Sequence, residues 1–370
     1  MGAGDILVQE DLARTLERIR DRGPEGFYAG ETADLILREM KRLGGIIVDE
    51  DLRRYRAAER KPVLGSYRGF EIIGMPPPSS GGVALIEMLN ILEGYDLGGA
   101  GLRGVREVHL LVEAMRRAFA DRARHLGDPD AAELPVSRLI SREHAAGLRK
   151  AIHPARASRS SEKSFEWPRE GSETTHLSVV DRNLMAVALT TTLEQGYGSR
   201  IVVPGAGFLL NNEMGDFNPK PGLTTRDGLI GTDPNLAGAE KRMLSSMAPT
   251  IVVRQERPFL VLGSPGGRTI INTVLLAIVN VLDHKMTIQD AVNAPRFHHQ
   301  WLPDRIDAEP WCFSPDTTAA LRAMGHDVKF LSGPQGSVMA IAVVPREGAG
   351  GWSLEVGLDR RRSDTGATGK

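Results

Sequence analysis

Two adjacent threonines, Thr174 and Thr175, open a run of β-forming residues in the segment SETTHLSVVD, residues 172–181. A threonine hydroxyl is a weak nucleophile unless a base accepts its proton, and an N-terminal threonine can use its own α-amine as that base. The α-amine has a reference pKa of about 7.7–8.0, so it is partly unprotonated near neutrality. An internal threonine gains this amine only when the peptide bond before it is broken. Taken alone, the segment is more typical of an ordinary strand that follows a loop.

A glycine-rich segment, GSPGG at residues 263–267, lies between an apolar strand-like run and an apolar helix-like run. Glycines let backbone N–H groups approach a ligand closely, and a helix N-terminus carries orphan donors and a partial positive charge. The segment therefore suits an anion or an oxyanion. Because no Gly-Lys-Ser/Thr follows, it is not a Walker loop. A tight strand-to-helix turn is the simpler alternative.

Two further polar pairs have a spacing that suits ligand binding. Glu213 and Asp216 lie three residues apart in FLLNNEMGDF, where two carboxylates would suit an ammonium group or a general acid/base pair. A solvated turn explains them equally well. Ser245 and Ser246 lie in an apolar setting in KRMLSSMAPT, where paired hydroxyls would suit a carboxylate, although a polar turn is the commoner role.

The elements that must position these residues change in character along the chain. Before residue 150 the apolar periodicity predicts helices, the first of them capped by Asp11 and ended by Gly23. A strand in YRGFEIIGM and a structured turn in PPPSSGG, residues 76–82, precede two more helices. The predicted helical ranges after the first are 32–43, 83–92 and 105–126. His109 lies beside the buried stripe of the last one, which favours a hydrogen-bonded core histidine over a ligand.

Residues 151–173 are rich in Ser, Arg and Glu and have no apolar period, which predicts a flexible linker. Beyond this linker the pattern predicts a hairpin from THLSVVD and MAVALTTT, and another from TIVVRQERPFLVLGS. A buried helix in RTIINTVLLAIVNVLDH and two closing strands in SVMAIAVV and WSLEVGLD follow. Helices followed by strand pairs predict a layered α+β fold.

Composition excludes several classes of protein. The 46 basic residues nearly balance the 47 acidic ones, so no broad field favours nucleic acid or an anionic membrane. Cys312 is the single cysteine, which excludes an intramolecular disulfide and a cysteine-based zinc site. No apolar run reaches the roughly 20 residues that span a bilayer. The first residues lack the pattern of a secretory signal and, read alone, indicate a cytoplasmic chain.

Seven motifs that follow one another along the chain contain the residues described above. TTHLSVVD, GFLLNNEMGDFNPKPG, KRMLSSMAPTIVV, LGSPGGRTIINTVL and NAPRFHHQWLPD, with MPPPSSGG and AMRRAFADRARHLGDPD upstream, closely resemble the γ-glutamyltransferases. These are N-terminal nucleophile hydrolases. The likeness extends from near residue 5 to the C-terminal region with compatible spacing, which a chance match to one motif would not do.

The resemblance implies a precursor that cleaves itself between Glu173 and Thr174. Residues 1–173 would form a large-subunit-like helical region that ends in the linker, and residues 174–370 a small-subunit-like catalytic region. Together they would form one four-layer αββα sandwich. Family members are generally exported, whereas this sequence shows no signal, so the compartment is left open.

The resemblance also assigns the site. Thr174 is implied as the nucleophile and Thr192 as the residue that orients it. The remaining implied positions are Glu213 and Asp216 for the donor's α-amino group, Ser245 and Ser246 for its α-carboxylate, and Gly266 and Gly267 for the oxyanion hole. The implied reaction cleaves γ-glutamyl amides such as glutathione and passes the group to water, an amino acid or a dipeptide, with neither metal nor organic cofactor.

Three departures from the family pattern bear on activity. The family has a segment ahead of the part that matches Gly4 onward, with a signal sequence and an arginine that pairs with the donor carboxylate. Glu194 stands where many members have an asparagine that helps to bind the donor, so this third carboxylate would strengthen ammonium binding and repel the donor carboxylate. In the expected lid loop, residues 222–242, Asp227 stands where some bacterial members carry a tyrosine.

Two alternatives to a γ-glutamyl enzyme follow from the same residues. One is an acylase of the same fold that removes glutaryl-like side chains from β-lactam nuclei, which would need less recognition of an α-amino group. The other is a truncated, inactive remnant that acts as a binding module or has no function.

Overall fold

The computed structural model describes residues 2, 4–160, 173–218, 232–346, 348, 351–362 and 365–369. The chain forms two compact units. The first contains Met1–Arg60 and Gln195–Asn212, and the second contains Lys61–Glu194 and Glu213–Lys370. The expected cleavage point between residues 173 and 174 lies within the second unit. Residues 161–172 of the predicted linker and residues 222–231 of the predicted lid loop, Asp227 included, lie outside the described residues.

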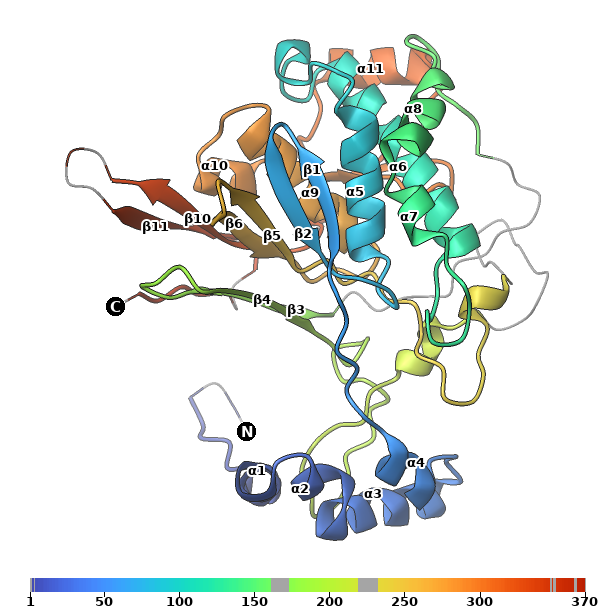
Figure 1. The fold of residues 1–370 in the computed structure, drawn as a ribbon, viewed down its shortest axis with the longest axis vertical. Helices are drawn as coiled ribbons and strands as arrows, with labels where there is room; N and C mark the ends of the chain where they lie inside the picture. The colour runs from blue at the N-terminus through green and yellow to red at the C-terminus, as the bar shows by residue number, and fades with distance from the viewer. Residues whose placement is uncertain are drawn as a thin grey trace. The chain divides into compact units, whose positions relative to one another are not determined.

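The first unit is helical and begins one residue before the predicted cap. Asp11 is not an N-cap, because the first helix starts at Glu10 after Gln9, which makes no side-chain capping bond. Asp11 instead pairs with Arg14 in the first turn. The helices of this unit (Figure 1) are α1 (Glu10–Arg22), α2 (Glu25–Tyr28), α3 (Gly30–Leu43) and α4 (Asp49–Arg54).

A small core holds the first unit together. Ile36 and Met40 of α3 are buried with Val203 and Ala206 from the second chain segment of the unit. The hydroxyl of Thr15 donates a buried hydrogen bond of 2.9 Å to the carbonyl oxygen of Ala206. Residues 195–212 thus belong to the helices by packing, although strands flank them in sequence.

The second unit is built on a six-stranded antiparallel sheet. The segment around YRGFEIIGM forms two strands rather than one. The hairpin predicted in TIVVRQERPFLVLGS is confirmed, and the two predicted closing strands pair with each other. Gln255 and Glu256 both have positive φ, 51° and 61°, as a two-residue hairpin turn with right-handed strand twist requires. The strand order is β1 (Val63–Tyr67), β2 (Phe70–Gly74), β5 (Thr250–Arg254), β6 (Arg257–Gly263), β10 (Met339–Pro345) and β11 (Trp352–Leu358).

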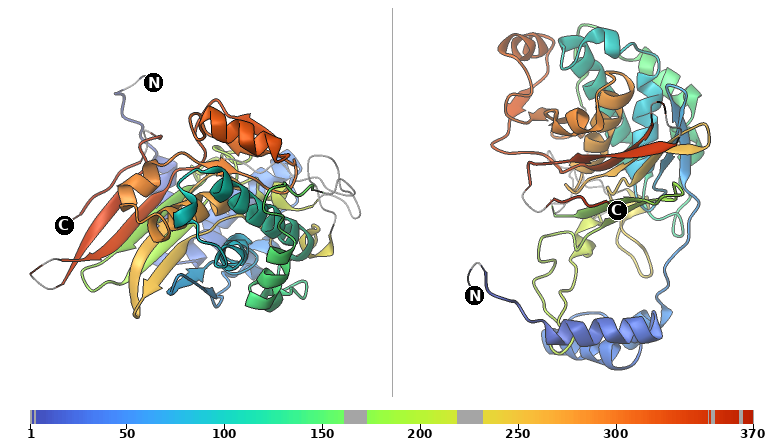
Figure 2. Two further views of the ribbon diagram at one scale, coloured as in Figure 1. Left: turned by 90° about the horizontal axis from the view of Figure 1, so that it is seen from above. Right: turned by 90° about the vertical axis from the view of Figure 1, so that its left-hand side faces the viewer.

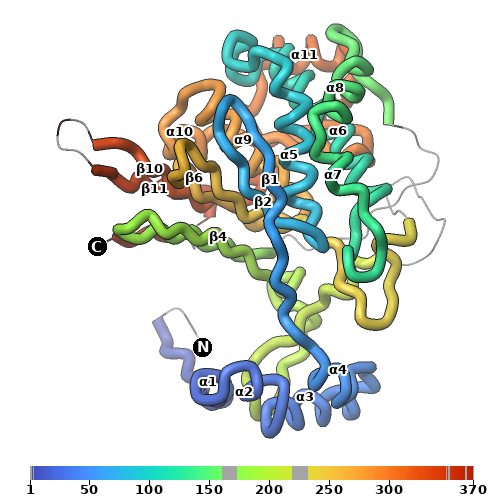
Figure 3. Tube along the Cα trace, viewed as in Figure 1, coloured from blue at the N-terminus to red at the C-terminus, as the bar shows by residue number. Residues whose placement is uncertain are grey.

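Helices cover one face of this sheet (Figures 1 and 2). Every residue of α5 (Gly81–Leu92) is buried, because α5 lies between β1 and β2 on one side and other helices on the other. α9 (Thr269–Leu282) packs on β6, and α10 (Ile288–Asn293) on β10 and β11. α6 (Val105–His125) and α8 (Arg142–Lys150) pack on α5. Figure 3 shows the chain passing from β2 into α5. The helix predicted over 83–92 is α5, and it starts two residues earlier than predicted, at Gly81.

The hairpin of β3 (Thr175–Val180) and β4 (Ala186–Thr191) lies against the sheet face opposite the helices, in contact with β5, β6 and β10. His176 of β3 is buried under Gly263, where an added Cβ would lie 2.2 Å from the imidazole. Its ring nitrogens lie 2.8 Å from Thr190 Oγ1 and 3.0 Å from Ser178 Oγ. Burial lowers the pKa of His176 to about 4, so it is a neutral packing residue.

Smaller elements complete the described part of the second unit. A three-stranded sheet contains β7 (Phe297–His298), β8 (Ile306–Ala308) and β9 (Val328–Phe330), and α7 (Val136–Leu139) and α11 (Pro315–Ala323) are further helices. Short 3-10 turns are η1 (Gly98–Ala100), η2 (Glu213–Asp216) and η3 (Asp233–Asn235). The fold is mixed α+β, as predicted. None of the described helices is both long and apolar enough to cross a bilayer.

Candidate active site

The residues singled out by the motifs surround one small space in the second unit. Its volume of about 20 Å³ suffices for roughly one water molecule. Gly266 and Glu173 border a neighbouring cavity of about 430 Å³. The small space is lined by Thr174, Thr192, Glu194, Glu213, Asp216, Ser245, Ser246, Met247, Gly267 and Ile270.

Thr192 is bound to the residue before the predicted nucleophile. Its hydroxyl donates to the carbonyl oxygen of Glu173 at 2.7 Å and accepts from the backbone N–H of Glu194, also at 2.7 Å. The β3–β4 register, which pairs Thr175 with Thr191, brings the ends of the hairpin together. The Glu173 carboxylate forms an ion pair of 3.2 Å with Arg362. The carbonyl of the Glu173–Thr174 bond is therefore polarised by a hydroxyl whose orientation is fixed.

The glycine loop turns its carbonyl groups toward helix α9. The carbonyl of Gly266 accepts from Thr269 N and Thr269 Oγ1, at 3.2 and 2.8 Å, and that of Gly267 accepts from Ile270 N at 3.1 Å. Gly266 has φ 131° and Gly267 φ 56°, conformations that L side chains rarely adopt. Within the described residues the N–H groups of the two glycines donate no hydrogen bond. They remain available for an oxyanion.

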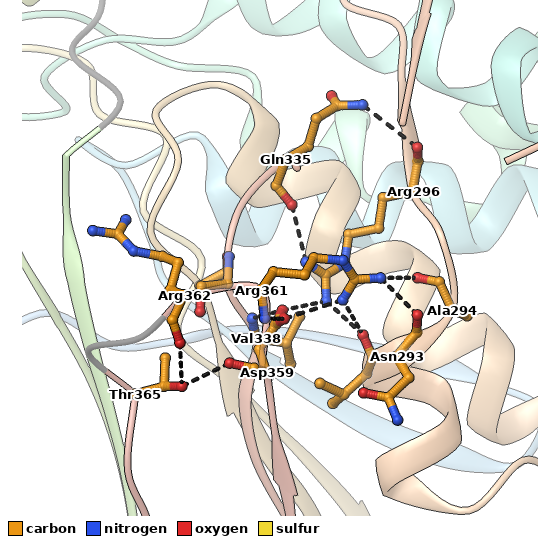
Figure 4. Close-up of polar contacts among 12 residues, drawn as sticks. Asn293, Ala294, Arg296, Gln335, Val338, Asp359, Arg361, Arg362 and Thr365 are labelled. Atoms are coloured by element: carbon orange, nitrogen blue, oxygen red, sulfur yellow. Dashed lines mark hydrogen bonds and ion pairs between the residues drawn. The ribbon is translucent and has the colours of Figure 1, made fainter. Parts of the chain in front are cut away.

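A buried ion pair supports the glycine loop from behind. A Cβ on Gly266 would lie 3.2 Å from the Cα of Gly336, so the two backbones nearly touch. Gln335, next to Gly336, accepts a hydrogen bond of 2.9 Å from Arg296, which is paired at 2.6 Å with Asp359 (Figure 4). This network fixes the loop against which Gly266 packs.

The PPPSSGG segment holds the serine pair by its backbone. Ser245 O accepts from Ser80 N at 2.9 Å and from Ser80 Oγ at 2.8 Å, while Ser79 Oγ donates to Met247 O at 2.6 Å. A Cβ on Gly81 would lie 2.2 Å from Met247 O, which explains the glycine at this position. The predicted structured turn is therefore hydrogen-bonded to the segment that contains Ser245 and Ser246. Both of these serine side chains are buried.

Arg122 is a site residue that the sequence analysis missed. It is 2% exposed, and its guanidinium donates to Ser246 Oγ at 2.8 Å and to Ser80 Oγ at 2.7 Å. Arg122 therefore places positive charge directly behind Ser246, on a serine that lines the pocket. The sequence feature that could have identified Arg122 is its position: it is an arginine three residues after Phe119, on the apolar stripe of α6.

Three carboxylates lie on another side of the pocket. Glu194, Glu213 and Asp216 are 5%, 9% and 7% exposed, which is inconsistent with a solvated turn. A Cβ on Gly215 would lie 3.3 Å from both carboxylate oxygens of Glu194, so Glu194 packs directly on η2.

Asn235, also missed by the sequence analysis, connects the carboxylate turn to the serine pair. Its side chain donates to Asp216 O at 2.8 Å and accepts from Leu244 N at 2.9 Å. The pocket is thus lined both by carboxylates and by hydroxyls, one of which is bonded to an arginine, and this combination suits a ligand with both an ammonium and a carboxylate.

Known proteins are similar to this chain in sequence and in fold. The gamma-glutamyltranspeptidase family model matches residues 1–369. The glutathione hydrolase proenzyme of Escherichia coli (strain K12) is 46% identical over 344 residues, which cover 92% of this chain and 59% of that protein. The acylase ACY 1 proenzyme of Pseudomonas sp. (strain V22) is 38% identical over 347 residues, with the same two shares of 92% and 59%. The structure of cephalosporin acylase from Bacillus halodurans matches with TM-score 0.81 and 26% identity, over 97% of this chain and 62% of that one.

The mixed α+β fold is thus one shared with cephalosporin acylase. The chain belongs to the gamma-glutamyltranspeptidase family. It spans 59% of the length of the Escherichia coli relative, and 57% and 65% of two glutathione hydrolase proenzymes from Pseudomonas.

Proposed function

We propose that the chain is a self-processing γ-glutamyl hydrolase and transferase that acts on γ-glutamyl amides such as glutathione. The observation that carries the proposal is the single pocket in which Thr174 meets buried carboxylates, buried serines and Gly267. The relatives named glutathione hydrolase proenzyme support it. The four-layer αββα sandwich, the large subunit 1–173 and the small subunit 174–370 are part of the same proposal.

Self-cleavage begins when the Thr174 hydroxyl attacks the carbonyl carbon of Glu173. The C–N bond breaks, the amine of Thr174 takes a proton, and an ester joins Glu173 to the Thr174 oxygen. Water then hydrolyses this ester and leaves a carboxylate on Glu173 and a free threonine N-terminus. The Thr192 hydroxyl, 2.7 Å from the carbonyl oxygen, stabilises the negative charge that develops on it.

Cleavage also prepares the pocket for a donor. At about 20 Å³ the space beside Thr174 is too small for a γ-glutamyl group, and Glu173 borders the larger cavity next to it. When Glu173 is released and moves away, we expect the two spaces to join. The Thr192 hydroxyl then loses its carbonyl partner and can orient Thr174.

In the donor reaction the Thr174 oxygen attacks the γ-carbonyl, and its α-amine accepts the proton and returns it to the leaving amine. The N–H groups of Gly266 and Gly267 stabilise the oxyanion, each such donor being worth about 2.7–4 kcal/mol. The resulting ester is then transferred to water, an amino acid or a dipeptide.

The ends of the donor are held at opposite sides of the pocket. Its α-ammonium faces Glu194, Glu213 and Asp216, and its α-carboxylate accepts from the hydroxyls of Ser245 and Ser246. Arg122 lies behind Ser246 and contributes positive charge on the carboxylate side. This charge acts through a serine, unlike the direct arginine that the family resemblance implies from a segment ahead of residue 4.

An acylase for glutaryl side chains is the second candidate, favoured by the acylase relative and by the fold shared with cephalosporin acylase. A glutaryl group has the terminal carboxylate of a γ-glutamyl group but no amine. Three buried carboxylates would then face a ligand that carries no ammonium group and would repel its carboxylate. The γ-glutamyl donor is therefore the better match.

The first experiment follows the purified chain by gel electrophoresis and mass spectrometry during long incubation. The intact chain of 40.2 kDa should give two fragments, one of which begins at Thr174, and Thr174→Ala should remain intact. A wild-type chain that stays a single band would refute self-processing and favour the inactive remnant.

The second experiment compares a γ-glutamyl anilide with a glutaryl anilide on the processed chain. Faster turnover of the γ-glutamyl compound is expected, and Glu213→Gln should reduce that preference. Equal turnover of the two would remove the case for Glu213 and Asp216 as ammonium ligands.

A further inference from the structure

A second cluster of polar side chains lies between three helices, with no part in the pocket around Thr174. Glu87 of α5, Asp121 of α6 and His144 of α8 each place one possible metal-ligand atom within 4.8 Å of the others. His144 Nε2 lies 2.7 Å from Asp121 Oδ2 and 3.8 Å from Glu87 Oε1. The three residues come from sequence positions that only the packing of α5 against α6 and α8 brings together.

Glu87 brings a buried carboxylate oxygen, Oε1, to this cluster. The Glu87 side chain is 1% exposed, and its Oε1 has no hydrogen-bond partner within the described residues. A buried polar atom in this state costs free energy that a ligand can recover. Burial, together with the charge of Asp121, raises the pKa of Glu87 well above its ordinary value.

We propose that Glu87, Asp121 and His144 bind a divalent transition-metal ion of the Zn²⁺ class. One imidazole and two carboxylates form a donor set that Zn²⁺ accepts in tetrahedral sites, with metal–ligand distances of about 2.0–2.2 Å. Ligand atoms around such an ion are about 3.4 Å apart, and the two measured separations fall on either side of this value. Ca²⁺ and Mg²⁺ favour oxygen-only sets with more ligands.

The cluster has a closed end and an open end. Glu87 forms the buried end, whereas the side chains of Asp121 and His144 are 13% and 16% exposed. His125, 33% exposed, has its Nε2 4.0 Å from Asp121 Oδ1 and lies at the open end. A metal ion would enter from this side, and water or His125 would supply the fourth ligand. The charge of Arg138, which also acts on Glu87, offsets part of the negative charge.

A second group of possible ligands, His109, Glu113 and His326, serves as a contrast. Here the carboxylate of Glu113 already accepts hydrogen bonds from Arg117 and from both the N–H and the hydroxyl of Ser158. His109 bonds to His326 at 2.9 Å and to a backbone carbonyl at 2.8 Å, which confirms the prediction of a hydrogen-bonded core histidine. Glu113 and His109 thus already have several hydrogen-bond partners, although His326 Nδ1 has none among the described residues, and we expect no metal there.

The position of the site indicates a structural role. Asp121 directly precedes Arg122, and Glu87 lies in the helix that begins after Ser80, so an ion would join the two helices that hold Ser246 and Ser245. The ion would stabilise this scaffold without contacting a donor. Its binding does not depend on the proposed catalytic activity.

The test uses the full, tag-free chain, first treated with EDTA and then titrated with Co²⁺ or Zn²⁺. Calorimetry should show one tightly bound equivalent, and Co²⁺ should give visible absorption bands typical of low coordination number. Glu87→Gln and His144→Gln should each weaken binding at least tenfold and abolish the increase in Tm that Zn²⁺ causes. His326→Gln should bind as wild type, and Mg²⁺ should cause no increase in Tm.

The two variants make the test independent of folding problems. Gln at position 87 keeps the shape of glutamate, and position 144 is only partly buried. Circular dichroism without metal checks that both remain folded. Absence of a bound equivalent in the wild type, or unchanged binding in both variants, would overturn the proposal.

Discussion

The Thr192 hydroxyl lies 2.7 Å from the carbonyl oxygen of Glu173, and its own oxygen accepts from the N–H of Glu194 at the same distance. The residue expected to orient the nucleophile is therefore bound to the carbonyl that the nucleophile would attack. In the proposed mechanism the same hydroxyl serves two reactions in turn, first self-cleavage and then attack on a donor.

Thr192→Ala should slow self-cleavage by about a hundredfold, because it removes one preorganised donor to the developing oxyanion. The half-life of the intact chain on a denaturing gel measures the effect. Thr192→Ser keeps the hydroxyl and should cleave at a rate near that of wild type. Equal rates for the alanine and serine variants would show that the hydrogen bond to Glu173 has no role in cleavage.

Gly266→Ala should lower kcat for a γ-glutamyl anilide by about 10²–10³-fold. The new Cβ would lie 2.6 Å from Thr269 Oγ1 at a φ of 131°, so the N–H groups of the loop would move. A second substitution, Thr269→Ala, removes the contact between the new Cβ and Thr269 Oγ1. The double variant should still be inactive, since the backbone strain at position 266 remains. Gly333→Ala is the matched control, because nothing lies within 4 Å of its added Cβ. A fully active Gly266→Ala enzyme would exclude this loop as the oxyanion hole.

Arg122→Lys should raise KM for the γ-glutamyl anilide by about tenfold or more and leave kcat nearly unchanged. Lysine keeps the charge, but as a single ammonium it cannot reproduce the fork that bonds Ser80 and Ser246. Hydrogen bonds to charged groups are worth about 1.5–3 kcal/mol. Arg124→Lys, on the same helix over the ring of Trp301, is the control. A lower Tm with unchanged KM would indicate that Arg122 has only a structural role.

Acidification should destabilise the chain through His176. Its pKa is lowered by burial to about 4 in the folded state, against about 6.5 when unfolded. Above about pH 6.5 His176 is neutral in both states and leaves the free energy of unfolding unchanged. Between about pH 6.5 and 4 only the unfolded state gains a proton, so up to about 3 kcal/mol of the free energy of unfolding is lost.

Chemical denaturation at several pH values measures this loss. His176→Gln retains hydrogen-bonding groups for Thr190 and Ser178 but cannot titrate, so its stability should depend less steeply on pH. His299 and His326 also have pKa values lowered by burial, to about 3 and about 4, and will leave a remaining slope. An identical pH dependence in wild type and variant would contradict the assignment to His176.

Local structure was largely predictable from the sequence. The hairpin after Thr174, the long helix over 105–125 and the buried helix after Gly267 follow from periodicity, because side chains that repeat with the period of a helix or strand must share one buried face. The first residues of helices were predicted less accurately, with α5 starting two residues before its predicted start. The predicted cap Asp11 was wrong because Glu10 already joins the first turn, and periodicity does not report backbone angles.

Residue types and spacing were enough to single out the groups that could do chemistry: a threonine before a strand, a glycine loop before a helix, a carboxylate turn and a serine pair. The motif resemblance then joined them into one site. The neighbours of these groups, in contrast, depend on the folded chain. Arg122 behind Ser246, Asn235 between Asp216 and Leu244, and Thr192 on Glu173 are contacts between residues distant in sequence. Such contacts depend on how strands pair and how α5, α6 and α8 pack, since the hydrogen-bonding capacity of a buried side chain is satisfied by whatever the fold brings near it.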